Sequence, residues 1–210
     1  MASQVDICNL ALGQIGADFI TSLSDPNLNA NLCNINYPLA RDAVLEDRDW
    51  TFATKEVQLN AIDPTTVVMP PEFGRVYALP DQCLVLIYCF IPSATAFPDG
   101  ALINIDPTSE QAVTRPSWNR FEDKIFSNTS TLYARYLKRI ENPAEFTTQF
   151  IQCLATRLAF ELAMPITNKV ELQEQKWKEY QLKLTSASIR DGRQGTPQVL
   201  QASKLTQSRY

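Results

Sequence analysis

The apolar residues of this 210-residue chain change their spacing twice, and that change constrains the fold more than any other feature. Up to about residue 50 they recur at the three- and four-residue intervals of an amphipathic helix. From Thr54 to about Lys138, short alternating or apolar runs are separated by Pro, Gly, Asn and Asp, which is typical of strands joined by turns. After Asn142-Pro143 the helical spacing returns. We therefore expect helices at both ends of the chain and strands inserted between them.

Two helices are predicted before the strands. Ser3 with Asp6 resembles a capping box, and Gly16 is a stop signal for the first helix. Its apolar face is expected to comprise Val5, Cys8, Ala11, Leu12 and Ile15. The second helix is predicted to run to about Asp47, and Pro38 either kinks it or begins a new helix. The stripe expected to be buried comprises Leu28, Leu32, Ile35 and Leu39. Because this stripe continues through Pro38, the kink is favoured.

The strand region carries three more specific predictions. The segment "CLVLIYCFI" (Cys83 to Ile91) is rich in β-branched and aromatic residues, which favours a central, well-buried strand. The segments "RFEDKIF" and "TLYARYLK" flank "SNTS", which predicts a hairpin with Asn128-Thr129-Ser130 as its turn. Between Ile91 and Ser117 a long connection is expected.

The helical period after the strands is strong, and it predicts two further helices. The first presents an apolar residue at every fourth position: Phe146, Phe150, Leu154, Leu158 and Leu162. Pro165 is expected to end it. The last helix is charged, ends near Asp191-Gly192, and has Val170, Trp177, Tyr180 and Leu184 on one face.

The predicted fold class is α+β. A helical bundle comprises residues 1–53 and 142–190, an antiparallel β subdomain is inserted at 54–141, and residues 191–210 form an extended C-terminal tail. The two terminal helix pairs must bury their apolar stripes against one another. Trp50 and Phe52 stand where the helical period ends, so we expect them to pack the junction between the helical and strand layers, together with Tyr77 and Pro80.

The composition argues against an enzyme. The chain contains no histidine, which excludes Ser-His-Asp and Cys-His catalysis and histidine metal sites. Its six glycines form no phosphate-binding loop, since Gly13 and Gly16 lie at a helix end. No catalytic residue, cofactor or metal is therefore expected.

Three charged clusters have competing interpretations. Asp42 and Glu46 share a helix face, so a Mg²⁺ pair is conceivable, but Arg41 and Arg48 beside Asp47 and Asp49 favour a solvated ion-pair face. A solvated face is likewise predicted for the mixed charges of the last helix: Glu171, Glu174, Glu179, Lys169, Lys176 and Lys178. The basic and aromatic run "TLYARYLKRI" is a weak nucleic-acid signal, and an amphipathic strand explains it better.

Several bulk features bear on the environment of the chain. The five cysteines form no CxxC pair, so buried free thiols in a reducing compartment are expected. No export signal is recognised at the N-terminus, and no apolar run reaches the ~18 residues of a membrane span. The net charge is −4. From Arg190 to Tyr210, four basic residues against Asp191 give +3, which leaves −7 for the rest.

Five segments, in order, resemble one protein family. They are "ICNLALGQIG", "NYPLARDAVLEDRDWTFATKEVQL", "YALPDQCL", "TLYARYLKRIENPAEFTTQFIQCLATRLAFELAMPIT" and "ASIRDGRQG". Together they cover about residues 4 to 195. The chain resembles the head-to-tail adaptors of short-tailed bacteriophages, the tail tubular protein A family.

This resemblance implies a structural virion protein, made in the host cytoplasm and located in the neck or tail of the virion. Copies would form a twelve-fold ring between the portal protein above and the tail nozzle protein below. The ring would extend the channel for DNA packaging, retention and ejection, through which DNA passes without sequence-specific binding. The C-terminal tail would dock on the portal through Arg193, Val199, Leu200, Lys204, Leu205, Arg209 and Tyr210.

Two alternatives stay open. One is a neck or tail-completion ring protein of another type, which would lack the portal-docking tail. The other is an intracellular scaffold whose strand domain binds a peptide.

Overall fold

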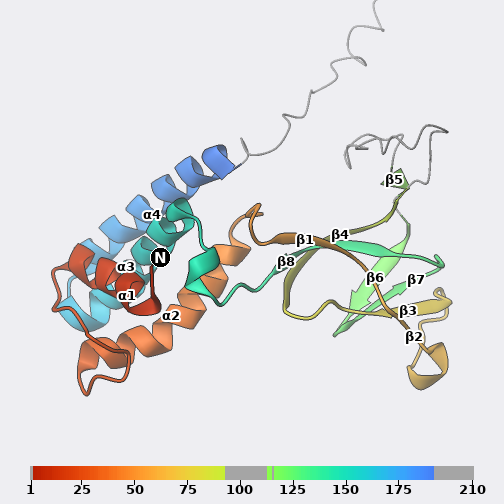
Figure 1. Ribbon diagram of the computed structural model, residues 1–210, viewed down its shortest axis with the longest axis horizontal. Coiled ribbons are helices and arrows are strands. Elements are labelled where there is room, and N and C mark those ends of the chain that lie inside the picture. Colours follow the sequence, from red (N-terminus) through yellow and green to blue (C-terminus); the bar gives the residue numbers. More distant parts are fainter. Residues whose placement is uncertain (1, 93–112, 115, 192–210) are drawn as a thin grey trace, which may run out of the picture.

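The computed structural model describes residues 2–92, 113–114 and 116–191, and within these it has helices at one end and strands at the other (Figure 1). The helices are α1 (Gln4–Ile15), α2 (Leu28–Glu46), α3 (Thr148–Thr167) and α4 (Val170–Asp191), with 3₁₀ turns η1 (Pro64–Thr66) and η2 (Pro143–Glu145). The strands are β1 (Thr54–Gln58), β2 (Ala61–Ile62), β3 (Arg75–Ala78), β4 (Cys83–Pro92), β5 (Val113–Thr114), β6 (Trp118–Phe121), β7 (Lys124–Ser127) and β8 (Tyr133–Lys138). The predicted α+β class is confirmed.

The first helix forms for the local reasons that its sequence suggests. The Ser3 amide donates to Asp6 Oδ2 at 2.8 Å, and the Asp6 amide donates to Ser3 Oγ at 3.1 Å, so the capping box is complete. Gly16 takes a φ of 72° as the C-cap, a left-handed conformation that glycine adopts without a steric cost. The start and end predicted for this helix are confirmed.

Helix α3 is the central element of the bundle, and α1, α2 and α4 all pack against it. All five residues predicted for its apolar stripe are buried. The prediction that Pro165 ends this helix was wrong, since the helix continues to Thr167 and Asn168 caps it with a φ of 54°. Proline fixes φ at a helical value, so in the last turn it costs one hydrogen bond without forcing the chain out of the helix.

Helix α2 runs without interruption through Pro38, so the prediction of one helix is confirmed, but the prediction of its buried face was wrong. Leu28, Ile35 and Leu39 are exposed, and Leu32 is only partly buried. The face that packs inward comprises Ala30, Cys33, Tyr37, Ala40, Arg41, Val44 and Leu45. Three of these residues are small, whereas Tyr37, Val44 and Leu45 are large residues that fill the core on this side of α2.

The strands form two antiparallel sheets of four strands, in the orders β1-β8-β4-β5 and β2-β3-β7-β6. Strand β4 is interior to its sheet, as predicted, but it is not well buried, because Cys89 alone among its described side chains is fully covered. Its residues Leu84 and Val85 pack partly against the helical core, whereas Leu86 packs against a separate core between the sheets. The strand therefore contributes side chains to two cores, and most of these side chains are only partly buried.

The hairpin predicted across Asn128-Thr129-Ser130 was wrong. The hairpin joins β6 to β7 and turns at Glu122, whose φ is 54°. The residues after β7 instead connect the second sheet to the first. In this segment the Asn128 side chain hydrogen-bonds to the loop before β3. Its Oδ1 accepts from the Gly74 amide at 2.8 Å, and its Nδ2 donates to the Glu72 carbonyl at 2.9 Å.

An aromatic cluster lies where the bundle meets the first sheet. Trp50 is almost fully buried, and its indole N–H donates to the Val44 carbonyl at 2.8 Å. Phe150 lies edge-on to Trp50, with 5.1 Å between ring centroids, and 5.2 Å from Phe52. Immediately after this cluster, the Ala53 carbonyl accepts from the Lys138 amide at 2.9 Å, which begins the β1–β8 ladder. The chain thus leaves the bundle and returns to it at one point.

Tyr77 and Pro80 do not join that cluster. Tyr77 is buried in the core between the sheets with Leu59, Ile125 and Leu132. Its hydroxyl donates to the Thr129 carbonyl. Pro80 lies in the turn between β3 and β4, where its carbonyl accepts from the Cys83 amide at 3.2 Å. Of the four residues predicted at the junction, the structure brings together only Trp50 and Phe52.

Replacing Trp50 with Ala is expected to destabilise the protein by about 3–5 kcal/mol, because the change removes a buried ring and leaves a cavity beside Phe150. The measurement is urea unfolding followed by circular dichroism. Val68→Ala is the control, since Val68 is 95% exposed and its truncation should leave the free energy of unfolding unchanged. An unchanged midpoint for Trp50→Ala would contradict the role of the cluster.

Candidate functional site

The exposed side of α2 is the most unusual surface among the described residues. Leu28, Ile35 and Leu39 are 60%, 54% and 67% exposed, and Leu32 between them is partly exposed. Their spacing of four, three and four residues puts all of them on one side of the helix. We call these four residues the α2 face. The sequence predicted that these residues are buried in the core, whereas the structure places them at the surface.

The part of α2 that carries the α2 face is uncharged, whereas Asp42 and Glu46 follow on the same side one and two turns after Leu39. The sequence from Pro26 to Ala40 contains no Asp, Glu, Lys or Arg. The other exposed residues on this stretch of helix include Asn31, Asn34 and Pro38, which are all neutral. The core of a protein–protein interface is depleted of charged residues in the same way. A solvent-facing helix more commonly has charged residues on its outer side.

The energy available from covering this face is moderate. Fully burying a Leu or Ile side chain stabilises by about 1.5–3 kcal/mol. Three such side chains are more than half exposed, so covering them would contribute about 3–5 kcal/mol. A complex with a dissociation constant of 1 μM needs about 8 kcal/mol net of the cost of association. The α2 face alone therefore supports a weak contact only.

A second apolar spot lies on α1. Leu10 is 51% exposed, and Phe19, in the loop after α1, is 68% exposed. The ring of Phe19 lies over Gly13, where an added Cβ would come within 3.2 Å of it. The Asn29 side chain donates to the Asp18 carbonyl at 3.0 Å, which fixes the loop against the start of α2. Because Gly13 has no side chain, the Phe19 ring can pack directly on α1 at this position.

Two open hollows of about 480 Å³ each lie near the start of α2 and of α1. The first is lined by Leu23 to Leu28 and Asn31. Its carboxylate, Asp25, accepts hydrogen bonds from the Thr21 and Ser22 amides. The second is lined by Ala2 to Val5, Ser22, Leu23 and Asn142 to Ala144. Neither hollow gathers titratable groups that could act on a substrate.

The acidic cluster at the end of α2 is used to join elements of the fold. Asp42 binds two guanidinium groups, with Arg41 Nη2 at 2.8 Å and Arg139 Nε at 2.9 Å. Arg41 is buried, so the solvated ion-pair face predicted here was wrong for this pair. Glu46, Arg48 and Asp49 are exposed, as expected. Within the described residues, no group of three or more His, Cys, Asp or Glu side chains is arranged to hold a metal ion.

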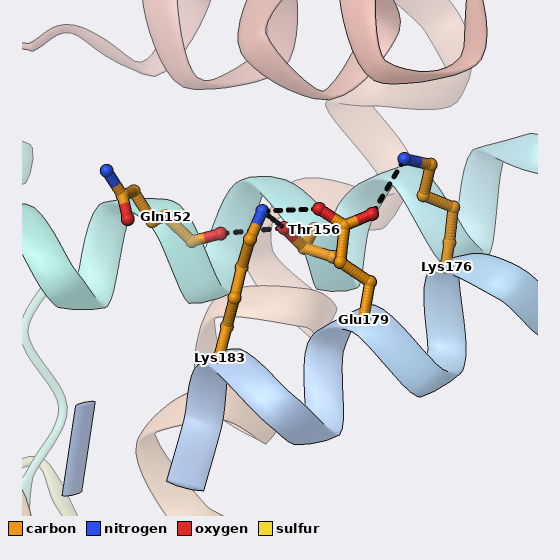
Figure 2. A network of polar contacts seen from close by, with 5 residues as sticks. All are labelled: Gln152, Thr156, Lys176, Glu179 and Lys183. Atoms are coloured by element: carbon orange, nitrogen blue, oxygen red, sulfur yellow. Dashed lines mark hydrogen bonds and ion pairs between the residues drawn. The ribbon is translucent and has the colours of Figure 1, made fainter. Parts of the chain in front are cut away.

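A polar network between α3 and α4 contradicts part of the solvated face predicted for the last helix (Figure 2). Glu179 bridges two lysines, with Lys176 Nζ at 2.8 Å and Lys183 Nζ at 2.7 Å. Lys183 also donates to the buried Thr156 hydroxyl at 2.8 Å, and that hydroxyl donates to the Gln152 carbonyl at 2.9 Å. Lys176 is only 8% exposed, because it lies on the side of α4 that faces α3.

Helix α4 is held by its aromatic residues as well. The Arg157 guanidinium lies over the rings of Phe160, Trp177 and Tyr180, at 5.2–5.7 Å from their centroids. The buried Tyr180 donates its hydroxyl to Asp47, just after α2, and burial raises the pKa of this phenol. Val170, which was predicted on the same face, is exposed.

The run "TLYARYLKRI" forms β8, the strand that the sequence favoured. Two of its three basic residues have side-chain partners inside the protein. Arg135 lies 3.6 Å from Glu56 and over the ring of Tyr88, and Arg139 binds Asp42. Tyr136 faces the interior. The run therefore does not present one basic and aromatic surface.

The cysteines are free thiols, and four of the five are buried, whereas Cys83 is half buried. Burial raises the pKa of Cys89 to about 12 and that of Cys153 to about 11, so these thiols are protonated near neutral pH. They act as small apolar residues in the packed core.

The predicted portal-docking residues Arg193, Val199, Leu200, Lys204, Leu205, Arg209 and Tyr210 lie outside the described residues. Most of the long connection predicted between Ile91 and Ser117 lies outside them too. No helix in the described part of the chain is long and apolar enough to cross a membrane.

Comparison with known proteins gives no assignment. No model of a known protein family matches the chain, and no curated protein matches it.

The ion pairs of Glu179 predict how the stability of the protein depends on pH. Hydrogen bonds from Lys176 and Lys183 hold the pKa of the Glu179 carboxyl below its usual value of 4.5. A carboxyl whose pKa is lower in the folded state stabilises the fold above its unfolded pKa, and this contribution is lost as the pH falls through the folded pKa. Glu179→Gln should therefore destabilise the protein by about 1–2 kcal/mol at pH 7, and the difference from wild type should shrink below about pH 4.5.

The measurement is urea unfolding of both proteins between pH 7 and pH 3. Glu174→Gln on the exposed side of α4 is the matched control, and it should leave the free energy of unfolding unchanged at every pH. An equal loss for Glu179→Gln at pH 7 and pH 3 would contradict the role of the carboxylate charge.

Proposed function

We propose that this chain is a structural virion protein, a head-to-tail adaptor whose copies form a ring between a portal protein and a tail nozzle protein. The single observation that supports this best is the α2 face, an exposed apolar surface without charge on a helix whose other side is packed. An exposed apolar surface of this kind is compatible with a protein partner that covers it. The five sequence segments that resemble the adaptor family, taken in their order, support the same proposal.

The expected symmetry follows from one weak contact repeated many times. A ring in which each copy contacts the next through two different surfaces closes without any strong pairwise interaction. We propose twelve copies on the basis of the family resemblance. In this arrangement the protein has no enzymatic role, and its function is to extend the channel through which the genome is packaged, retained and ejected.

The distribution of charge fits a channel protein. The chain up to residue 189 has a net charge of −7, and the stretch from Arg190 to Tyr210 has +3. An acidic wall repels the phosphate backbone, so DNA would pass without binding. The basic C-terminal residues would then be available for an acidic surface of the portal.

A neck protein of another ring type would use the α2 face equally well, and the C-terminal residues distinguish the two. Deleting the residues after Gly195 should leave the melting temperature of the free protein unchanged within about 1 °C, because the deletion removes no residue of the bundle described above. The same deletion should prevent attachment to portal-bearing heads and leave heads without tails. The measurements are calorimetry of the free protein and electron microscopy of assembled particles.

A matched variant that keeps the length but replaces Lys204 and Arg209 with Gln tests the charge separately. It should weaken attachment without abolishing it if charge and apolar anchors both contribute. Full attachment by the deletion variant would exclude the portal-docking role and favour the alternative ring protein.

A further inference from the structure

We propose that Cys8 and Cys33 form an oxidisable pair, which hydrogen peroxide converts into a disulfide that joins α1 to α2. Both residues are free thiols in the structure, and neither has any exposed surface. They lie on the inward sides of their helices and belong to the same core cluster. The pair is a property of the folded bundle, so it does not depend on the function proposed above.

The two thiols interact directly across the interface between α1 and α2. The Cys8 thiol donates a hydrogen bond to the Cys33 sulfur. A disulfide has an S–S bond of about 2.05 Å. Sulfur atoms at hydrogen-bond distance reach this length by side-chain rotation and a slight approach of the two helices. Oxidation of the pair therefore does not require the bundle to be rebuilt.

The loop between the two helices fixes them relative to one another. Asn9, the residue after Cys8, donates from Nδ2 to the Ile20 carbonyl and accepts at Oδ1 from the Ile20 amide, both at 2.9 Å. At the start of α2, the Asn29 side chain donates to the Asp18 carbonyl at 3.0 Å. Because the loop is fastened to both helices, the disulfide forms between groups that are already ordered.

The hydrogen bond makes the two sulfurs unequal. It lowers the pKa of Cys33, whereas the same hydrogen bond together with burial raises the pKa of Cys8. The thiolate, and not the thiol, is the reactive form of cysteine. Cys33 is therefore the sulfur that attacks the oxidant, and Cys8 is the one that completes the disulfide.

A buried hydroxyl beside the pair is free to donate. Tyr37 lies one turn after Cys33 on the inward side of α2, and its hydroxyl has no hydrogen-bond partner among the described residues. Burial, and then the charge of a nearby Cys8 thiolate, raise the pKa of Tyr37 to about 12, so the phenol keeps its proton at neutral pH. An unpaired hydroxyl in a core is costly. It gains a partner when an oxygen or a negative charge appears on the pair.

The reaction proceeds in two steps. The Cys33 thiolate attacks one oxygen of hydrogen peroxide, the O–O bond breaks, and the hydroxide that leaves takes up a proton to become water. Cys33 is then a sulfenic acid. The Cys8 sulfur attacks the Cys33 sulfur, the S–O bond breaks, and the leaving hydroxide takes the Cys8 proton. Overall, two thiols and one peroxide give one disulfide and two waters.

Burial sets the rate of this reaction, and the length of the closed loop sets its effect. Because both sulfurs are covered, peroxide reaches them only when the helices part locally, so the pair should react more slowly than an exposed thiol. The disulfide would close a loop of about 25 residues, which restricts the unfolded chain. Oxidation should therefore raise the melting temperature by about 5–10 °C.

The experiment treats the folded, fully reduced full-length protein with hydrogen peroxide and then maps its disulfides by mass spectrometry. The five thiols should fall to three, because one disulfide consumes two. Trypsin would leave both cysteines in one peptide, since the first Lys or Arg of the chain is Arg41. Cleavage before Asp18 and Asp25 separates them, so the Cys8 and Cys33 peptides stay together only if a disulfide links them.

Three variants test the pair by calorimetry before and after oxidation. Cys153→Ala is the matched control, because Cys153 is a buried thiol of the same core whose sulfur is not hydrogen-bonded to another cysteine. Wild type and Cys153→Ala should gain melting temperature on oxidation and lose the gain with dithiothreitol. Cys8→Ala and Cys33→Ala should gain none.

The disulfide map of wild type decides the proposal even if a variant fails to fold. A linked pair of Cys8 and Cys33 peptides from folded protein supports it. Five remaining thiols overturn it, as do oxidation that ends at sulfenic or sulfinic acids and a disulfide between other cysteines. An equal gain in melting temperature for Cys33→Ala and wild type overturns it as well.

Discussion

The burial of α3 on several sides is the constraint on which the rest of this fold depends. Its large residues Phe150, Leu154 and Leu158 alternate with Ala155 and Ala159, and all of them are fully covered. One helix cannot cover them, so the chain supplies α1 and α2 from its beginning and α4 from its end. The strands between must therefore begin and end at the bundle. They do so at the aromatic cluster, where leaving and returning segments are joined by a hydrogen bond.

The two outer helices are attached to α3 by different chemistry, and their outer surfaces differ accordingly. Helix α4 uses polar and cation–π contacts, since Lys183 donates to the Thr156 hydroxyl and the Arg157 guanidinium lies over the rings of Trp177 and Tyr180. Helix α2 uses small residues such as Ala30 and Cys33. The inward side of α2 also includes Tyr37, Val44 and Leu45. Both sides of this helix therefore carry large apolar residues, and those of the α2 face remain exposed.

The sequence predicts features that depend on near neighbours and misses those that depend on distant ones. The capping box of Ser3 and the four-residue period of α3 are local, and both predictions were correct. For α2, two stripes fit a helical period equally well, and only the surface of α3 decides between them. The hairpin turn at Asn128 was predicted wrongly because Asn128 hydrogen-bonds to Gly74 and Glu72, which are 54 and 56 positions away in the sequence. The buried role of Lys176 could not be seen without knowing which side of α4 faces α3.

The hydrogen bond between Ala53 and Lys138 has a mechanical consequence. Strands β1 and β8 leave the bundle from the same end and are paired along their whole described length, from Thr54 with Leu137 to Gln58 with Tyr133. A force that pulls the bundle away from the far end of the sheets is shared by β1 and β8. The strands β1 and β8 therefore join the bundle to the strand region as part of one sheet, in which β4 pairs with the other side of β8. The two parts are coupled through paired backbone and not through a single unpaired linker.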